Sequence, residues 1–301
     1  MSDTLTQRKP RYGEAVIKVI LVAAAAVSIF TTFGILLSVV IPAIAFFREI
    51  PVWSFLTGTE WTPLFKDGQF GVLPLISGTL VITVIAVAVA IPFGLGAAIY
   101  LSEYANPRVR RTLKPTLEVL AGIPTVVYGF FALEFLTRIV LVRIFPDIDI
   151  FNALSAGLIM GIMIIPTVAS LSEDAMSAVP AGLRDGSYAL GSSKRQTAVK
   201  VVIPAALSGI VAAFVLGISR AIGETMIVTV AAGLEPRLSI NPLEGMQTMT
   251  SYIAAAGAGD LATGSIEYQS IFAVGLLLFI MTFLMNMVSI RLVRRFRQVY
   301  Q

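Results

Sequence analysis

Apolar residues in this chain gather in six long runs that are separated by shorter polar segments. A helix that crosses a bilayer needs roughly 20 mostly apolar residues, and each run is long enough to supply them. The runs lie near residues 16–47, 72–102, 116–137, 150–172, 205–233 and 269–290. The pattern predicts an all-α integral membrane protein with about six transmembrane helices.

The first apolar run could be mistaken for a secretory signal, because Ala43-Ile44-Ala45 resembles a cleavage site. Its length far exceeds the roughly 7–15 apolar residues of a signal peptide, so we interpret it as a retained span. We expect a tail over residues 1–15, a single membrane domain over 16–295 and a second tail over 296–301.

Positive charge divides the polar segments into two groups. Four segments hold four Lys or Arg residues each, and basic residues favour the cytoplasmic side of a membrane. Both termini should therefore lie in the cytoplasm, and a net charge of +4 needs no nucleic-acid partner to explain it. The four groups are Arg8, Lys9, Arg11 and Lys18; Arg108, Arg110, Arg111 and Lys114; Arg184, Lys194, Arg195 and Lys200; and Arg291, Arg294, Arg295 and Arg297.

Composition supports the membrane assignment and excludes several kinds of chemistry. Hydrophobic residues make up 56% of the chain and charged residues 13%, whereas soluble domains are about 25% charged. Cysteine and histidine are absent, which excludes disulfides and the usual zinc sites, so we expect no metal site and no catalysis. No P-loop motif occurs, so any ATP and Mg²⁺ must bind to a partner subunit. Trp53 and Trp61 fall in the first external loop and are expected to anchor it at the membrane interface.

The polar segment 173–204 has the pattern of a folded loop. Pro180 suits the start of a short helix, Gly191 can end it, and Ser192 or Ser193 can cap a second helix that continues into the fifth span. Two interpretations of the short helix remain open. It could dock into a groove on a partner protein or lie on the lipid surface.

This loop resembles the Glu-Ala-Ala motif of ABC-importer permeases. The corresponding residues are Asp185-Gly186-Ser187, then Gly191, then Val201-Val202-Ile203-Pro204. The glycine spacing and final proline match, whereas Asp replaces Glu, Gly-Ser replaces Ala-Ala and Val replaces Ile. The resemblance implies a coupling helix that inserts into an ATPase subunit. The residues expected in this coupling loop are Leu183, Asp185, Gly186, Ser187, Tyr188, Gly191, Ile203 and Pro204.

Four further stretches narrow the resemblance. They are "FGVLPLISGT" (70–79), "AIYLSEYA" (98–105), "LKPTLEVLAGIPTVVYGFFAL" (113–133) and "SRAIGETMIV" (219–228). They are similar to permeases of phosphate-specific importers, most of all the C-type subunit, over nearly the whole chain. The resemblance implies type I ABC-importer architecture in the cytoplasmic (inner) membrane. It also implies three partners in addition to membrane lipid: a homologous second permease, an ATPase dimer and an extracytoplasmic phosphate-binding protein.

The fifth span carries Arg220 and Glu224 within an apolar run. Read as one continuous helix over 205–233, it places Arg220 near mid-membrane, where exposure to lipid costs at least about 2.5–3.5 kcal/mol. Positions 205, 209, 213, 217 and 221 are all Ala or Gly. Such a stripe allows a neighbouring helix to approach closely, so the charges should face a helix interface or a cavity.

Two interpretations of Arg220 and Glu224 compete. One helical turn apart, they could neutralise each other as an ion pair, although the Arg-before-Glu order is the less favourable one. Alternatively, Arg220 binds a tetrahedral oxyanion during translocation and Glu224 restrains it between transport events. We favour the second interpretation, because ionisable residues inside membranes are usually functional. The family resemblance implies the same role.

Other candidates are weaker. Gly122-Ile123-Pro124 should kink or unwind the third span, and Tyr128 one turn later could line a pathway, although packing explains these residues equally well. Glu134 and Arg138 have the spacing of an interfacial ion pair. The external segment 234–267 is too polar to span. It could form a re-entrant or surface helix that meets a substrate-delivery protein, or a plain loop.

The sequence thus predicts one half of a phosphate translocation pathway, driven by ATPase subunits through alternating access. Three alternatives remain: an ABC permease for another oxyanion such as molybdate or sulfate, an ion-coupled secondary transporter, and a membrane scaffold without transport. The knob-like loop argues against the secondary transporter, and the mid-membrane charges argue against the scaffold.

Overall fold

The computed structural model describes residues 12–65 and 68–296, and throughout them the chain is helical apart from connecting loops and one isolated antiparallel bridge between Trp61 and Phe70. Among the basic residues named above, Arg8, Lys9, Arg11 and Arg297 lie outside this range, as does most of each predicted tail. The elements, in which η marks a π-helical stretch, are α1 (Tyr12–Glu49), α2 (Val52–Thr57), α3 (Leu73–Ile99), η1 (Tyr100–Tyr104), α4 (Pro107–Ala121), α5 (Thr125–Phe130), η2 (Phe131–Leu141), α6 (Val142–Ile144), α7 (Ala153–Ser177), α8 (Ala181–Ala189), α9 (Lys194–Thr197), η3 (Ala198–Val202), α10 (Ile203–Ile222), α11 (Met226–Ala231), α12 (Met249–Gly257) and α13 (Ile266–Phe296).

Six helical segments in the described part are long and apolar enough to cross a membrane, which confirms the predicted all-α class and the number of spans. They are Val16–Glu49, Leu73–Tyr104, Thr125–Ile144, Ala153–Ser177, Lys194–Ile222 and Ile266–Arg291. Four of these lie close to the predicted ranges. The third and fifth differ, and both differences matter for the site.

The helix α7 forms the centre of the bundle and packs most extensively against α3 and α10. Glycines make the contact with α3 close. A Cβ atom added at Gly157 would lie 2.7 Å from the Ile85 side chain, and one at Gly161 would lie 2.8 Å from the Ala86 carbonyl oxygen. Larger residues at these positions would separate the two helices and open the core.

The predicted stripe of small residues on α10 packs against α7. A Cβ atom at Gly209 would lie 2.4 Å from the Cβ of Ala175, and one at Gly217 would lie 3.1 Å from the side chain of Val168. This confirms the interface that the spacing predicted, and it fixes the end of α10 beside the middle of α7.

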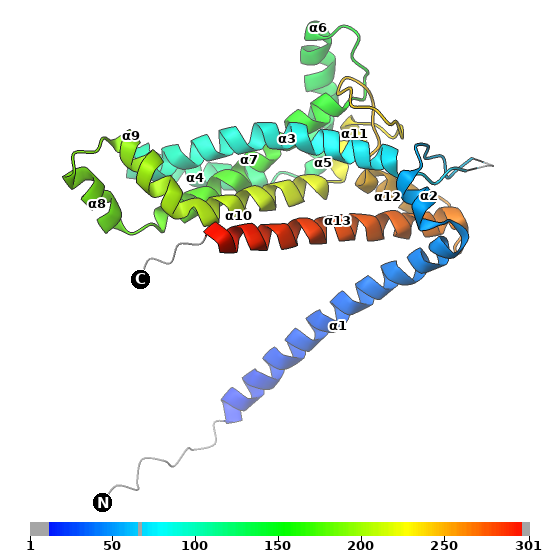
Figure 1. The fold of residues 1–301 in the computed structure, drawn as a ribbon, viewed down its shortest axis with the longest axis horizontal. Helices are drawn as coiled ribbons and strands as arrows, with labels where there is room; N and C mark the ends of the chain where they lie inside the picture. Colours follow the sequence, from blue (N-terminus) through cyan, green and yellow to red (C-terminus); the bar gives the residue numbers. More distant parts are fainter. Residues whose placement is uncertain (1–11, 66–67, 297–301) are drawn as a thin grey trace, which may run out of the picture.

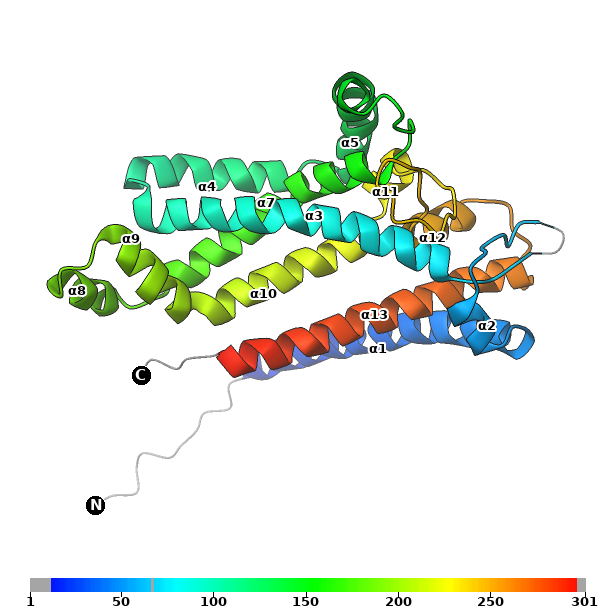
Figure 2. The ribbon, with the colours of Figure 1, turned by 45° about the horizontal axis from the view of Figure 1, so that its top comes forward.

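Two parts project from this bundle. The helix α1 contacts α13 near one end and then diverges from it, and its most apolar 18-residue window has no buried residue (Figure 1). The helical arm α5–η2–α6 stands across the direction of α3 and α7 (Figure 1). Figure 2 shows that the chain turns back after η1, so α4 runs antiparallel to α3 and packs against α7.

The third span begins later than predicted. Residues 116–121 belong to α4, which has no buried residue, and the span covers 125–144 instead of 116–137. Pro124 explains the shift, because proline lacks an N–H group and disfavours helical geometry at the preceding residue. The predicted break at Gly122-Ile123-Pro124 is therefore present, and it separates two helices.

The fifth span also differs from the single helix predicted over 205–233. It begins at Lys194, runs through α9, η3 and α10, and ends at Ile222; α11 follows as a separate short helix. Gly223 at the junction has low helix propensity, and the Glu224 side chain binds backbone amides that a continuous helix would use. Arg220 and Glu224 therefore do not share one helix.

At the other end of the bundle, the loop between α1 and α3 folds against α12. Trp61 is 1% exposed and packs edge-on against Tyr252 and Phe55, so its predicted role as an interfacial anchor is wrong. Trp53 is 76% exposed and fits that role.

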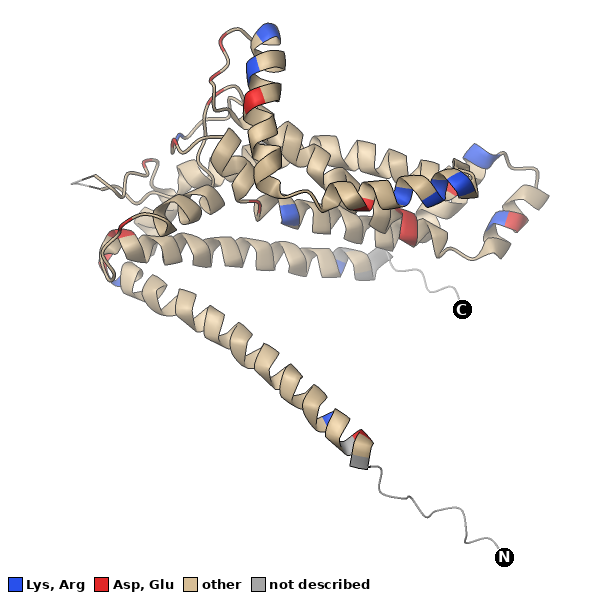
Figure 3. Ribbon diagram, turned by 180° about the vertical axis from the view of Figure 1, so that it is seen from behind, with Lys and Arg blue, Asp and Glu red and all other residues tan. Residues whose placement is uncertain are grey.

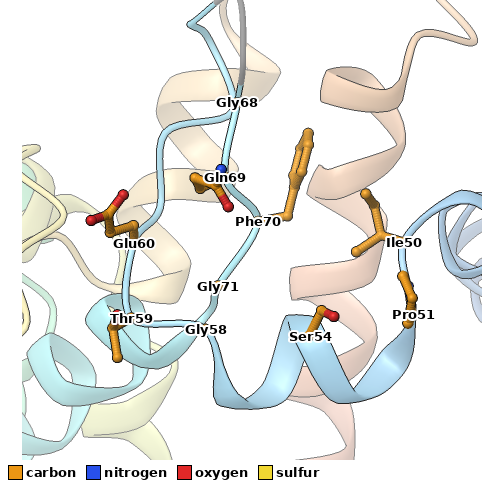
Figure 4. A pocket seen from close by; sticks show the side chains of 10 residues that line it. All are labelled: Ile50, Pro51, Ser54, Gly58, Thr59, Glu60, Gly68, Gln69, Phe70 and Gly71. Atoms are coloured by element: carbon orange, nitrogen blue, oxygen red, sulfur yellow. The ribbon is translucent and has the colours of Figure 1, made fainter.

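The loop crosses itself at Gly58 and Gly71. A Cβ atom at Gly71 would lie 2.3 Å from the Gly58 carbonyl carbon. The crossing borders a cavity of about 380 Å³ lined in part by Ser54, Glu60 and Gln69 (Figure 4).

Candidate functional site

Arg220 lies in the last turn of α10, where the negative end of the helix dipole favours a cation. Its guanidinium Nη1 donates a hydrogen bond to Thr167 Oγ1 on α7 at 3.0 Å, and the residue is half-buried. No carboxylate lies within ion-pair distance of Arg220 in the part of the chain that the structure describes. Most of its five N–H donors thus remain available.

Glu224 lies in the junction between α10 and α11 and is 9% exposed. Its Oε1 accepts hydrogen bonds from the amides of Met226 at 3.0 Å and Ile227 at 3.4 Å, which caps the start of α11. The Thr250 hydroxyl on α12 donates to the Glu224 carbonyl at 2.6 Å. The i, i+4 ion pair with Arg220 is absent, because the helix ends between the two residues.

The second helix break lies beside the first. Tyr128 on α5 donates its hydroxyl to the Leu120 carbonyl at 2.9 Å, across the Gly122–Pro124 break. The Arg220 guanidinium is close enough to interact electrostatically with the Tyr128 phenol. A Cβ atom added at Gly129 would lie 3.0 Å from Val230, which shows how closely α5 and α11 approach. The fold thus brings Tyr128 and Arg220 together.

This arrangement is suited to an anion. Broken helices in membrane proteins expose backbone groups where they line a site, and a guanidinium matches the oxygens of a tetrahedral oxyanion in geometry. Thr167 orients Arg220 without neutralising it. Gly122 and Pro124 are exposed at the neighbouring break, so both breaks are accessible in this chain.

The loop 173–204 forms the predicted helix, turn and second helix. The helix α8 ends before Gly191, which has a φ of +78°, and Ser193 caps α9 in a capping box with Gln196. Asp185, Gly186 and Tyr188 are exposed on α8. The Ser187 and Thr197 hydroxyls are 2.9 Å apart and join the two helices.

The remaining residues predicted for the loop lie against the bundle or beside it. Leu183 and Ile203 pack against the core formed by α3, α7 and α10, and Pro204 is exposed at the start of α10. At the other end, Glu134 and Arg138 form the predicted ion pair at 3.4 Å, with both side chains more than half exposed.

A family model described as "Binding-protein-dependent transport system inner membrane component" matches residues 90–298. The chain belongs to this family. It is 38% identical over 232 residues to the "Probable ABC transporter permease protein YqgH" of Bacillus subtilis, covering 77% of this chain and 74% of that protein. It is 35% identical over 253 residues to the "Phosphate transport system permease protein PstC" of Mesorhizobium japonicum, covering 77% and 75%.

Solved structures share the fold of this permease. The structure titled "Crystal structure of a bacterial ABC transporter involved in the import of the acidic polysaccharide alginate" aligns with a TM-score of 0.64 at 15% identity, over 96% of this chain and 100% of that chain. An inward-facing MetNI methionine ABC transporter aligns with a TM-score of 0.57 at 22% identity, over 76% and 95%. The chain is therefore a multi-pass permease subunit of the inner membrane, and such subunits carry no ATPase activity.

Sequence reasoning missed a network around Glu173, whose side chain is fully buried near the end of α7. Arg110 and Lys114 on α4 both pair with it, the latter at 2.7 Å, and Ser177 donates to it at 2.8 Å. Although burial lowers the pKa of Lys114, hydrogen bonds to Asp174 and Glu173 raise it, and the net shift is upward. The sequence signal for this network was the pair Glu173 and Asp174 directly after the fourth apolar run, together with the basic segment 108–114, which is predicted on the same side of the membrane.

Proposed function

We propose that this permease carries inorganic phosphate into the cell as part of an ATP-driven importer. The observation that carries the proposal is the half-buried Arg220 guanidinium, which lies beside a helix break, donates to the Thr167 hydroxyl and has no carboxylate partner among the described residues. The relatives named as phosphate transport system permeases support phosphate as the anion. Bringing charge into the membrane is costly unless a site offers compensating charge, and Arg220 supplies it.

The orientation follows from charge. Lys and Arg residues gather at the end of the bundle where α4, α8 and α9 lie (Figure 3). The positive-inside rule assigns that end to the cytoplasm. The start of α1 and the end of α13 point toward the same end (Figure 2), so both termini are cytoplasmic in this proposal.

The cytoplasmic helix α8 docks into an ATPase subunit. Its apolar residue Tyr188 is 42% exposed and the following Leu190 is 89% exposed, which is suited to a groove on a partner. An ATPase dimer binds ATP and Mg²⁺, its closure moves α8, and the membrane helices alternate between outward and inward access. A homologous second permease completes the pathway, and an extracytoplasmic phosphate-binding protein delivers the anion to the opposite face.

Glu224 has a more limited part than the sequence suggested. Its carboxylate caps α11 here, so it leaves Arg220 free for the anion in this conformation. The restraint of Arg220 by Glu224 between transport events would require α11 to release that carboxylate. The role of Glu224 is therefore to hold the helix break open while phosphate passes.

The test is uptake of radiolabelled phosphate by the assembled complex in proteoliposomes, with ATP supplied to the ATPase side. We expect uptake that requires ATP and the binding protein and that persists when the proton gradient is collapsed. Uptake that follows the proton gradient and ignores ATP would indicate an ion-coupled secondary transporter. Stronger transport of sulfate or molybdate than of phosphate would indicate a permease for another oxyanion.

A further inference from the structure

The helix α8 has few apolar contacts that could fix it to the membrane bundle. It contains no buried residue, and Leu183 alone among its side chains packs partly against the core. A helix that receives force from a partner must be attached firmly to the elements it moves. The attachment of α8 must therefore depend largely on polar contacts, and most of these involve one residue, Arg184.

Arg184 reaches from α8 into the bundle and donates four hydrogen bonds. Its Nη2 and Nε donate to Glu103 Oε1 at 2.9 and 3.3 Å. The same guanidinium donates to the carbonyls of Met176 at 2.8 Å and Val179 at 2.7 Å, at the end of α7. Carbonyls at the end of a helix lack partners within it, so Arg184 joins α8 to both α3 and α7.

The position of Glu103 favours its contact with Arg184. It lies in the π-helical stretch η1 at the end of α3, and its side chain is only 4% exposed. π-Helical insertions often occur at functional positions, because they redirect side chains. A buried carboxylate without a counter-ion is strongly disfavoured, so Glu103 requires Arg184. Separating Arg184 from Glu103 would leave the buried carboxylate without a counter-ion, so the two residues should stay in contact when α8 moves.

The contact also leads toward the anion site. Met176 lies nine residues after Thr167 on the same helix α7, roughly 13 Å along its axis. Thr167 is the residue that holds Arg220. Arg184 therefore connects α8 to the same centrally packed helix that carries the Arg220 contact.

We propose that Arg184, through Glu103 and the carbonyls at the end of α7, is the positioning residue that couples α8 to the membrane helices. This inference rests on the proposed function, since it assigns the path by which ATPase movement reaches the site. Arg184 touches neither phosphate nor ATP in this scheme. Its substitution should therefore separate ATP hydrolysis from transport without abolishing hydrolysis.

The experiment measures phosphate uptake and ATP hydrolysis together in proteoliposomes that contain the assembled complex with Arg184→Gln, Glu103→Gln or Arg184→Lys. We expect the ratio of phosphate transported to ATP hydrolysed to fall roughly tenfold in the two Gln variants, within the usual range of coupling between sites. Arg184→Lys keeps the charge but replaces the planar fork of the guanidinium, which contacts Glu103 and both carbonyls, with a compact ammonium on a flexible stem, so its ratio should fall between those of the Gln variants and the wild type.

Arg195→Gln, an exposed position on the neighbouring α9, is the matched control and should keep the wild-type ratio. If Arg184→Gln does not assemble, Glu103→Gln carries the test, because it keeps the size and an acceptor oxygen. An unchanged ratio in the variants that assemble would overturn the inference, and so would an equal loss of hydrolysis and uptake. A wild-type complex that shows no ATP-dependent phosphate uptake would instead contradict the proposed function.

Discussion

Two pairs of arginine and glutamate occupy opposite situations in this permease. Arg184 and Glu103 are 81 positions apart in sequence, yet they form an ion pair whose carboxylate is buried, with direct contacts of 2.9 and 3.3 Å. Arg220 and Glu224 are four positions apart, yet no ion pair joins them in the described chain, because a helix ends between them. For these two pairs, unlike Glu134 and Arg138, proximity in sequence was therefore a poor guide to pairing.

The difference distinguishes an arginine that links two helices from an arginine that is available to bind a ligand. An arginine that is paired with a buried carboxylate holds elements together, since separating the pair leaves an uncompensated buried charge. A half-buried arginine with only a neutral hydroxyl partner retains its charge for a ligand. This contrast is the basis of our two proposals, force transmission by Arg184 and anion binding by Arg220, and four predictions test it.

The largest effect is expected for Arg220→Gln. Hydrogen bonds to charged groups contribute about 1.5–3 kcal/mol each, so loss of the cation should reduce ATP-dependent phosphate uptake by roughly one to two orders of magnitude. The measurement is the initial rate of radiolabelled phosphate uptake by the assembled complex. Uptake at the wild-type rate would show that Arg220 has no role in phosphate translocation.

A bulky charged residue at Gly191 should disconnect the loop from the ATPase. The φ of +78° is strained by about 1–3 kcal/mol for most non-glycine residues, so Gly191→Glu should displace α8 from its docking position. We expect ATP hydrolysis that is no longer coupled to uptake. Gly191→Asn is the control, because Asn tolerates positive φ, and equal coupling in both variants would contradict the docking assignment.

Thr167→Val tests the positioning of Arg220. It removes one neutral partner, worth about 0.5–1.5 kcal/mol, so uptake should fall only a few-fold and the apparent affinity for phosphate should weaken. The concentration dependence of uptake measures both. Thr167→Ser retains the hydroxyl and should behave as the wild type; if Val and Ser variants transport equally, the contact has no role in transport.

The smallest effect is expected at Arg138. Its ion pair with Glu134 is more than half exposed, and such pairs contribute roughly 0–1 kcal/mol. Arg138→Gln should leave uptake within about twofold of the wild type, which makes it a matched arginine control for Arg220→Gln. A loss comparable to that of Arg220→Gln would mean that arginine removal acts through stability.

Much of the architecture could be predicted from the sequence. Six apolar runs predicted six spans, the small-residue stripe predicted a close helix–helix interface on α10 without naming its partner, and Gly191 with Ser192 or Ser193 predicted the turn beside α8. These features depend on local composition and spacing. The site was predicted only in part: Arg220 and Tyr128 were named, but Thr167 and Thr250 were not, because their partners are distant in sequence.

The sequence by itself determined that this chain crosses a membrane and that its basic segments divide into two groups, because hydropathy and charge act residue by residue. It also marked one helix break, since Gly122-Ile123-Pro124 disfavours helix locally, whereas the break at Gly223 was not predicted. Only the tertiary structure decided which charges neutralise each other. That choice depends on which helix ends meet, and packing of α7 against its neighbours placed Glu103 beside Arg184 and left Arg220 without a carboxylate among the residues described.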